Sequence, residues 1–552
     1  MAQMTIDGRA VACELHENYE DVLRRELGVA HREALGVRIG GRSLPLRAQV
    51  QDGAQLALLT IHTEEGRRIY ERSLRFVLLM AVRALYPKAR VRIENSTSGG
   101  VYAKVDDLAL NEAVTADIAQ KMRQLVACDL PFEKQVIPRE RAIEHFSKEG
   151  ATDKVRLLTY RPFEHFQMYR CDGMLEYFYG EMAPSTGYVP VFSLEYYQSD
   201  PGLQLLLPNP ADPARPIPFL DQPKLHQTFA QSTRWANILG CENVADLNEM
   251  VNKKRLREFI RVNEALQEQA IFSIATKFIE SGAQLILIAG PSSSGKTTFT
   301  HRLSIALRVL GKQPNKISLD DYYVNRDSIP LDEYGERDLE RLDTLDVPLF
   351  NEHLVRIIAG ECVGVPLYDF VSGTRMDKTH PTQIAPGEPI LVEGIHALNP
   401  ELTHSVSDDK KFRIYISALT TLNLDDHNRI RTTDMRLLRR MVRDHQFRGT
   451  KPEQTLSMWD SVRRGEERFI FPFQENADIM FNSTLVYESA ILKKYAYPML
   501  SAVPEDSPFY TRSRRLVKFL NYIQSADVED EIPINSILRE FIGGCCFYRD
   551  ED

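Results

Sequence analysis

The stretch LILIA-GPSSSGKT, residues 285–297, decides the fold. Its first part, 285–289, is a continuous apolar run, as expected of a parallel strand that is buried on both faces. The second part, 290–297, fits the pattern G-x-x-x-x-G-K-[ST], and a helix is predicted to follow from about Thr297 to Leu310. A strand, a glycine-rich loop and a helix in this order predict a loop that wraps around phosphate groups.

The chemistry of such a loop requires these residue types. Glycines let the backbone curl so that successive N–H groups point at phosphate oxygens, and the helix N-terminus adds partial positive charge. Lys296 would span the β- and γ-phosphates of ATP, and the Thr297 hydroxyl would reach Mg²⁺. A chance match in a Gly/Ser-rich turn is the alternative, but far fewer chance matches lie between a buried strand and a helix. The candidate ATP-binding residues are therefore Gly290, Ser292, Ser293, Ser294, Gly295, Lys296, Thr297 and Thr298.

Similar apolar runs recur beyond the loop, at 316–319, 390–392 and 412–416, with helical segments between them. Strands that alternate with helices predict an α/β domain with a doubly wound parallel sheet. We place this P-loop domain at 281–490.

Carboxylates follow two of these runs. Asp320 comes directly after 316–319, and Glu393 comes directly after 390–392. Because the carboxyl ends of parallel strands meet at the crevice where ligands bind, both acids should face the phosphate loop. There Asp320 would accept a proton from an attacking hydroxyl or hold Mg²⁺ through water, and Glu393 would order the water shell of the metal. Without the loop, a capping role for Asp320 in the next turn would be the better interpretation.

The basic stretch DMRLLRRMVRD, residues 434–444, places four arginines on one helical face: Arg436, Arg439, Arg440 and Arg443. Four guanidinium groups on one stripe repel each other unless anions neutralise them. A triphosphate would supply those anions, so the stretch predicts a mobile lid that closes over the nucleotide. The alternative is a solvated basic face; the lack of interleaved acids favours the lid.

Other classes of P-loop protein fit the sequence less well. There is no N-K-x-D motif that would read guanine, which argues against a GTPase. Nothing in the sequence resembles the arginine-finger architecture of motor ATPases. The residues therefore favour a kinase that transfers the γ-phosphoryl group of ATP to a hydroxyl, and a plain ATPase stays open as an alternative.

Together these features resemble the uridine kinase and phosphoribulokinase family of P-loop kinases over about residues 285–485. The phosphate loop, DDYY at 320–323, YDF at 368–370, VEGI at 392–395 and the lid segment R-R-x-x-R-D-x-x-x-R-G all occur in family order. The resemblance implies a Mg²⁺- and ATP-dependent nucleoside kinase.

The resemblance also implies roles for single residues. Asp320 would be the general base on the ribose 5′-hydroxyl, and Glu340 matches the acid that clamps the ribose. Arg448, with other lid arginines, would bind phosphates of ATP. The catalytic set would be Asp320, Lys296, Arg440 and Arg443. The metal set would be Thr297, Glu393 and Asp320. The substrate set would be Glu340, Tyr368 and Arg375.

The sequence departs from the family at positions that recognise the nucleoside. A histidine that reads the pyrimidine edge in uridine-cytidine kinases is Gly373 here. The arginine that ends the lid motif R-G-R is Thr450, and a glutamine further along is Met458. Phosphoryl transfer is therefore better supported than uridine as the acceptor, and a sugar phosphate or another small alcohol stays open.

The N-terminal half is predicted to form two modules. Residues 1–62, with a helix at 18–27 and a strand at 55–61, look like the small TGS β-grasp module. Residues 63–205 resemble the editing-type α+β domain of threonyl-tRNA synthetase, chiefly in RSLRFVLLMAVRALYP at 72–87. From the apolar spacing we expect an amphipathic helix there, ended by the proline.

The metal ligands of that editing domain are replaced in this sequence. Its H-x-x-x-H pair corresponds to Arg72 and Phe76, and its later pair corresponds to Phe178 and Met182. Phenylalanine cannot bind a metal, and a lone methionine is at best a soft ligand. We therefore expect neither a metal site nor editing hydrolysis in this half, which leaves scaffolding or binding of RNA or a small ligand.

Two further segments complete the chain. In 206–280, the stretch 207–218 holds five prolines and indicates a rigid linker, and 245–280 is predicted to be helical throughout. A helical C-terminal extension is predicted at 491–552.

Composition limits the class of protein and the compartment in which it is expected. The chain has 552 residues, enough for about three or four domains, and its 43% hydrophobic and 26% charged residues are typical of a globular protein. Seven scattered cysteines and the lack of a secretion signal indicate free thiols in the cytoplasm, and no run is long enough to span a membrane. The net charge of −9 argues against a protein that coats nucleic acid. An ATP-sensing RNA- or tRNA-binding regulator without kinase turnover, and a homo-oligomer, stay open.

Overall fold

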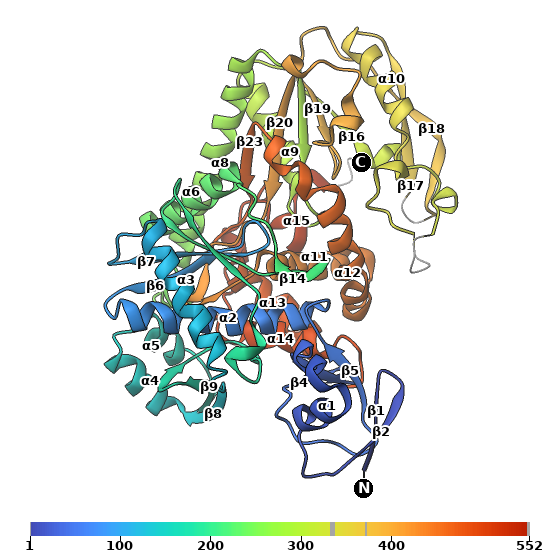
Figure 1. Ribbon diagram of the computed structural model, residues 1–552. Coiled ribbons are helices and arrows are strands. Elements are labelled where there is room, and N and C mark those ends of the chain that lie inside the picture. The colour runs from blue at the N-terminus through green and yellow to red at the C-terminus, as the bar shows by residue number, and fades with distance from the viewer. Residues whose placement is uncertain (1, 332–336, 370–371, 549–552) are drawn as a thin grey trace.

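The computed structural model describes residues 2–331, 337–369 and 372–548 (Figure 1). Of the motif at 368–370, Phe370 lies outside the described residues.

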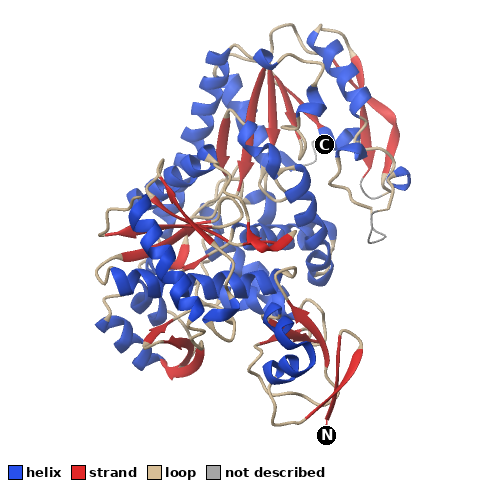
Figure 2. Cartoon of the chain, in the orientation of Figure 1, coloured by secondary structure: helices blue, strands red, loops and turns tan. Residues whose placement is uncertain are grey.

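A five-stranded parallel sheet, in the order β16-β19-β15-β20-β23, forms the centre of the C-terminal half (Figure 2). Its strands are β15 (Leu285–Ala289), β16 (Asn315–Ser318), β19 (Ile390–Glu393), β20 (Lys411–Ser417) and β23 (Ile479–Asn482). The predicted parallel sheet is confirmed. Strand β23 is not among the predicted runs because it is short and only its Phe481 is buried.

Both faces of this sheet are covered. The side chains of Ile286 and Ile288 pack into one core with α9, and those of Leu285 and Leu287 pack into another with α10. This is the doubly wound α/β arrangement that the sequence predicts. The helices of this half are α8 (Leu256–Ser281), α9 (Lys296–Val309), α10 (Val347–Ile358), α11 (Thr432–Arg448), α12 (Pro452–Phe469) and α13 (Glu488–Ser501).

Two antiparallel hairpins extend from the sheet domain. Strands β17 (Val363–Asp369) and β18 (Thr374–Thr382) form a hairpin beside α10, at the upper right of Figure 1. Strands β21 (Asn423–Asp425) and β22 (Asn428–Arg429) form a shorter one just before α11. The short hairpin faces the N-terminal half: the Asp426 carbonyl oxygen accepts a hydrogen bond from the Ile93 N–H.

The first module is a mixed five-stranded sheet in the order β2-β1-β5-β3-β4, with β1 parallel to β5. Its elements are β1 (Ala2–Ile6), β2 (Arg9–Cys13), α1 (Tyr19–Leu27), β3 (Gly36–Ile39), β4 (Arg42–Leu44) and β5 (Gln55–Leu59). The sheet and its single long helix have the predicted β-grasp arrangement. Asn18 caps α1 by accepting a hydrogen bond from the Asp21 N–H at 2.9 Å.

The long helix α2 (Glu64–Leu85) runs through the middle of the molecule (Figure 1). The predicted amphipathic helix from Arg72 is wrong in two respects. The helix begins at Glu64, after the Thr63 cap, and every residue from Arg68 to Val82 is buried. The helix is enclosed because α3 packs on one side while residues of the C-terminal half, such as Asp434, contact its arginines on another.

Around α2 lie two antiparallel sheets, β11-β12-β7-β6 and β10-β9-β8. The first consists of β6 (Arg90–Asn95), β7 (Val101–Asp106), β11 (Ser193–Tyr197) and β12 (Gly202–Leu206). The second consists of β8 (Glu133–Pro138), β9 (His165–Cys171) and β10 (Met174–Glu176). The helices of this part are α3 (Glu112–Ala127), α4 (Arg139–Lys148) and α5 (Thr152–Thr159).

The region between the halves differs from the predictions. The proline-rich stretch is a hairpin of β13 (Pro208–Asn209) and β14 (Asp212–Pro216), followed by α6 (Pro223–Leu239). The predicted continuous helix at 245–280 is two helices, because α7 (Val244–Asn252) ends before Lys254, whose φ of 57° breaks the helical backbone. Helix α8 then begins at Leu256.

The C-terminal segment is only partly helical. After α14 (Tyr510–Leu520) and an irregular stretch comes the short α15 (Arg539–Ile542). Thr511 donates hydrogen bonds to the Gly41 carbonyl oxygen through its N–H at 2.9 Å and its hydroxyl at 2.7 Å, so the segment supports the first module. Helix α15 then packs against α11 of the sheet domain. No helix within the described ranges is long and apolar enough to cross a membrane.

Candidate active site

The phosphate loop joins β15 to α9 and has the backbone that its sequence predicts. Gly295 has a φ of +85°, which favours glycine, and Ser293 also lies in the left-handed region at 59°. A Cβ atom at Gly290 would lie 2.0 Å from the Ile416 carbonyl oxygen, so only glycine fits there. Because α9 begins at Lys296, its first N–H groups point out of the helix end toward the loop.

Two carbonyl groups of the loop accept hydrogen bonds from side chains outside the loop. Arg436 Nε donates to the Ser292 carbonyl oxygen at 2.9 Å, and the Ser483 hydroxyl donates to the Ser294 carbonyl oxygen at 2.5 Å. Side chains outside the loop thus engage these two carbonyl groups, while the Ser292 N–H donates to Glu466 Oε1 at 3.2 Å, and it is the N-terminal end of α9 that suits an anion.

Two of the predicted lid arginines belong to this support. Arg436 is paired with the buried Glu466, and Arg439 is paired with the buried Glu488; both arginines are at most 1% exposed. The interpretation that all four arginines await a triphosphate is therefore wrong for these two. The acids that neutralise them lie 30 and 49 residues further along the chain, outside the stretch 434–444.

The remaining lid arginines have a different setting. Arg440, Arg443 and Arg448 all approach the buried Asp444, at 3.2, 3.0 and 3.4 Å. Arg440 also donates to the Ser292 hydroxyl at 2.9 Å, which brings it to the phosphate loop. One carboxylate does not neutralise three guanidinium groups, so this end of α11 stays positive. The first part of α11 is core rather than a mobile lid.

Lys296 and the two threonines after it lie at the start of α9. Lys296 Nζ donates to the Gly290 carbonyl oxygen at 2.9 Å, so the ammonium group folds across the loop. The Thr297 hydroxyl lies 3.3 Å from Glu393 Oε1. This pair of oxygen ligands at the edge of the loop is of the kind that Mg²⁺ prefers.

Asp320 comes just after β16 and Glu393 is the last residue of β19, and these two strands are neighbours in the sheet. Desolvation raises the pKa of Asp320, although nearby Lys296 and arginines at the end of α11 lower it. Desolvation, together with the charge of Asp320, raises the pKa of Glu393 to about 7. The raised pKa values mean that the negative charges of these two adjacent carboxyl groups are poorly compensated. A bound cation would compensate them, so the pair indicates a cation site.

The predicted ribose-clamping acid, Glu340, lies near the same crevice. Its side chain packs so closely on Gly465 of α12 that a Cβ atom there would lie 2.2 Å from the Glu340 Cβ. Burial and the charge of Glu466 raise the pKa of Glu340 to about 7, and Arg440 and Lys296 act in the opposite direction. Its Oε2 atom is buried and has no hydrogen-bond partner within the described ranges.

The other two predicted substrate residues lie on the β17–β18 hairpin. Tyr368 packs on Tyr323 with ring centroids 5.5 Å apart. Arg375 donates to Asp346 at 3.1 Å and to the Tyr322 carbonyl oxygen at 3.2 Å. Arg375 therefore braces the turn that carries Asp320, a role that its sequence position did not indicate.

Gly373, at the position of the family's base-reading histidine, is covered by the side chain of another residue. Gly373 has a φ of +73°, and a Cβ atom there would lie 2.8 Å from the Arg326 guanidinium carbon. Met458 is 40% exposed on α12.

The C-terminal segment contributes residues that sequence reasoning missed. A Glu540 carboxylate oxygen accepts hydrogen bonds from the Thr298 hydroxyl at 2.7 Å and from the Thr298 N–H at 3.3 Å. The Tyr548 hydroxyl lies 3.4 Å from the same threonine, and Phe547 stacks on His301 with centroids 4.7 Å apart. An anionic side chain therefore lies on the first turn of α9, and no local motif marks it.

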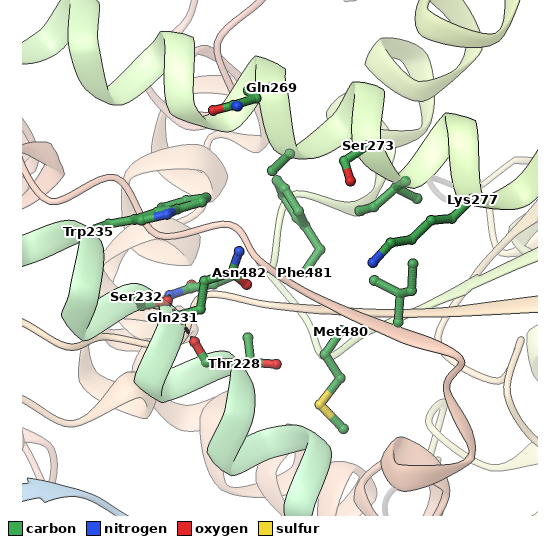
Figure 3. A pocket seen from close by; sticks show the side chains of 13 residues that line it. Thr228, Gln231, Ser232, Trp235, Gln269, Ser273, Lys277, Met480, Phe481 and Asn482 are labelled. Carbon is green, nitrogen blue, oxygen red and sulfur yellow. Dashed lines mark hydrogen bonds between the residues drawn. The ribbon is translucent and has the colours of Figure 1, made fainter.

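A separate cavity of about 300 Å³ lies between α6, α8 and β23 (Figure 3). Trp235, Lys277 and Asn482 are among its lining residues, and none of the predicted site residues is. It lies at the β23 edge of the sheet, whereas Asp320 follows β16 at the opposite edge.

In the N-terminal half, aromatic packing fills the positions of the editing-domain ligands. The Phe76 ring lies 5.2 Å from that of Phe178 and 5.5 Å from that of Phe132. Met182 is 3% exposed in the same core. Arg72 donates a hydrogen bond to the Glu181 carbonyl oxygen.

Comparison with known proteins decides the class of this site. Residues 285–488 match the model of the phosphoribulokinase / uridine kinase family. A uridine kinase from Lactobacillus johnsonii is 32% identical over 200 residues, which are 36% of this chain and 84% of that enzyme. This chain belongs to the phosphoribulokinase / uridine kinase family. Its C-terminal half is a P-loop kinase domain for a small-molecule substrate.

Two other similarities complete the comparison. A threonine–tRNA ligase from Desulforamulus reducens is 32% identical over 158 residues, which are 28% of this chain; the chain spans about a quarter of the length of that ligase. The solved structure of D-glycerate 3-kinase from Cryptococcus neoformans aligns with 48% of this chain and 89% of its own, at 15% identity and a TM-score of 0.23.

Proposed function

We propose that this protein transfers the γ-phosphoryl group of ATP to a hydroxyl of a small acceptor, and that the acceptor is the ribose 5′-hydroxyl of a nucleoside. The observation that carries the proposal is the placement of Asp320 and Glu393 at the ends of adjacent strands, with Lys296 and Thr297 facing them across the phosphate loop. A base, a metal-water ligand and a phosphate clamp at one crevice are what direct phosphoryl transfer requires.

The residues present fit ATP and Mg²⁺. Side chains outside the loop engage the Ser292 and Ser294 carbonyl oxygens, Thr297 and Glu393 supply oxygen ligands, and the Glu540 carboxylate already lies on the Thr298 N–H at the start of α9. When bound, ATP supplies the phosphoryl group and Mg²⁺ neutralises charge on the phosphates.

The chain's own residues would act as follows. Asp320 accepts the proton of the acceptor hydroxyl, and its raised pKa makes it a better base than an ordinary aspartate. Lys296 and Arg440 hold the phosphate oxygens, since both groups already bond to atoms of the loop. Arg443 and Arg448 add positive charge at the end of α11, where charge develops during transfer.

A nucleoside acceptor is supported by the family and by Glu340, whose unpaired, buried oxygen is suited to accept hydrogen bonds from ribose hydroxyls. The identity of the nucleoside's base stays open, because Arg326 lies over Gly373, the position from which a uridine-recognising side chain would project. For the rest of the chain we propose a TGS-like module at 1–62 and a synthetase-editing-like scaffold at 63–205 that binds no metal.

The acceptor is identified by a panel experiment. The purified full-length chain is incubated with Mg-ATP and each common nucleoside, with ribulose 5-phosphate as the sugar-phosphate alternative, and kcat/KM is measured from ADP release and product mass. We expect one nucleoside to be preferred and Lys296→Ala to abolish its turnover. Preference for ribulose 5-phosphate would overturn the assignment of a nucleoside as the acceptor but would support kinase activity.

The raised pKa of Glu340 predicts a pH-dependent acceptor affinity. Below pH 7 the carboxyl group is protonated and loses its negative charge, so KM for the acceptor should rise several-fold from pH 8 to pH 6. Glu340→Gln should have a high KM throughout this range, without the pH dependence. KM for ATP, measured in parallel, is the control; an equal rise in both KM values would contradict the role of Glu340.

The position of Glu540 predicts that the C-terminal segment weakens nucleotide binding. The Glu540→Gln variant removes the negative charge from the helix end that faces the phosphates, so the dissociation constant for ATP should fall about two- to fivefold. The matched control is Glu531→Gln, whose partners Arg257 and Arg261 belong to α8. Weaker ATP binding in Glu540→Gln would show instead that this carboxylate completes the site.

A further inference from the structure

A buried cavity of about 40 Å³ lies between α2 of the N-terminal half and the segment that leads into α11. Its charged lining comes from both halves of the chain. The positive residues are Arg68, Arg72, Arg75, Arg429, Arg431 and Arg515. The negative residues are Glu71 and Asp434. Six guanidinium groups thus face two carboxylates, which leaves a surplus of four positive charges.

Each of these carboxylates is already shared. Asp434 accepts hydrogen bonds from Arg68 at 2.9 Å and from Arg515 at 2.6 Å. Glu71 accepts a hydrogen bond from Arg431, and its Oε1 lies 3.8 Å from Arg429 Nε and 3.9 Å from Arg75 Nε. Two carboxylate charges are therefore divided among five of the six arginines, and the surplus among the lining residues remains.

One acid just outside the cavity offsets part of this charge. Glu64 accepts hydrogen bonds from Arg68 and from Arg512. Because Arg512 is itself paired with Asp460 at 2.6 Å, Glu64 offsets one positive charge at Arg68 and Arg515, and a surplus of three positive charges remains.

The surplus is also visible as missing hydrogen bonds. The Nε atoms of Arg72, Arg75 and Arg429 are buried and have no hydrogen-bond partner in the part of the chain that the structure describes. Arg72 and Arg75 are only 8% and 7% exposed, so bulk water does not compensate them. Guanidinium groups keep their charge even when buried. Burial, with Arg72 and Arg429 nearby, lowers the pKa of Arg75 to about 10, although Glu71 opposes the shift.

We propose that this cavity binds a tetrahedral oxyanion, such as inorganic phosphate, between the two halves of the chain. Forked N–H donors of arginine match the oxygens of phosphate. A space of this size holds only about three water molecules, which suits a free oxyanion and excludes a nucleoside or its monophosphate. The anion would tie α2 to the start of α11, the helix whose other end carries Arg440 and Arg443.

The test is phosphate binding by the full-length chain with the phosphate loop disabled. The background is Lys296→Ala, and radiolabelled inorganic phosphate is followed by equilibrium dialysis at constant ionic strength set with chloride. We expect saturable binding that Arg75→Met weakens about tenfold or more, since charge-assisted hydrogen bonds are lost. The control is Arg83→Met, an exposed arginine on the same helix that pairs with Glu149, and it should bind phosphate normally.

Other arms keep the result interpretable. If Arg75→Met does not fold, Arg431→Met serves, because its side chain is 23% exposed. Anomalous diffraction from crystals soaked in selenate should show the anion in the cavity. Three results would each overturn the proposal. They are the loss of all phosphate binding in Lys296→Ala, an equal weakening of phosphate binding by Arg83→Met, and binding of AMP but not of inorganic phosphate.

Discussion

Asp320→Asn is expected to lower kcat by about 10²- to 10⁴-fold, because the amide cannot accept the proton of the attacking hydroxyl. Asparagine keeps the size of the side chain and its place after β16. The dissociation constant for ATP should therefore change little. Single-turnover measurement of product formation, with ATP binding measured separately, distinguishes loss of the base from loss of the nucleotide.

The matched control is Asp321→Asn, the neighbouring acid on the same turn. The Asp321 carboxylate accepts a hydrogen bond from the Tyr368 backbone N–H, so it serves the hairpin rather than the crevice. We expect Asp321→Asn to keep most of the activity. If both variants lose activity equally, or if Asp320→Asn stays active, Asp320 is not the base.

Glu466→Gln is expected to destabilise the kinase domain by about 3–5 kcal/mol, because it leaves the Arg436 guanidinium buried without its charged partner. Glu466 also accepts a hydrogen bond from the Ser292 N–H, so the phosphate loop should loosen as well. Urea unfolding followed by tryptophan fluorescence in a Trp235→Phe background measures the change locally, because the remaining tryptophan is Trp459, whose ring lies 5.5 Å from the Arg436 guanidinium carbon.

The control for this prediction is one residue away. Glu467 is 59% exposed and pairs with Arg463 on the surface of α12. Exposed ion pairs contribute about 0–1 kcal/mol, so Glu467→Gln should leave the unfolding midpoint almost unchanged. Equal midpoints for the two variants would mean that Arg436 finds another partner, and that the support of the loop is not built as described.

The elements that the sequence predicted best are those with a local cause. The phosphate loop needs Gly290 and Gly295 because of contacts and backbone angles at those positions, and the strands beside it are marked by continuous apolar runs. Asp320 and Glu393 could be placed because the carboxyl ends of adjacent parallel strands meet at one edge.

The parts that the sequence did not predict depend on partners far away in the chain. Arg436 and Arg439 look like a basic stripe until Glu466 and Glu488 are brought to them by α12 and α13. Glu540 reaches Thr298 across 242 residues, and no spacing rule relates two such positions. Ion pairs between distant elements depend on tertiary packing, which a short stretch of sequence does not reveal.

The N-terminal half shows the same limit. The period of apolar residues in α2 predicts a helix but not its surroundings, because its arginines are buried against residues from the other half. A window that ends at Leu85 gives no sign of Asp434 or Arg429. The proline-rich stretch likewise forms a hairpin, since β13 and β14 pair with each other rather than stay extended.

The central claim is that this site moves a phosphoryl group from ATP to a hydroxyl. The most direct measurement follows the label of γ-³²P-ATP with the full-length protein, Mg²⁺ and a mixture of nucleosides, and compares the wild type with Lys296→Ala and Asp320→Asn. Our account predicts a labelled nucleoside monophosphate with the wild type and almost none with either variant. Label that appears only as inorganic phosphate, or ATP that binds without being consumed, would contradict it.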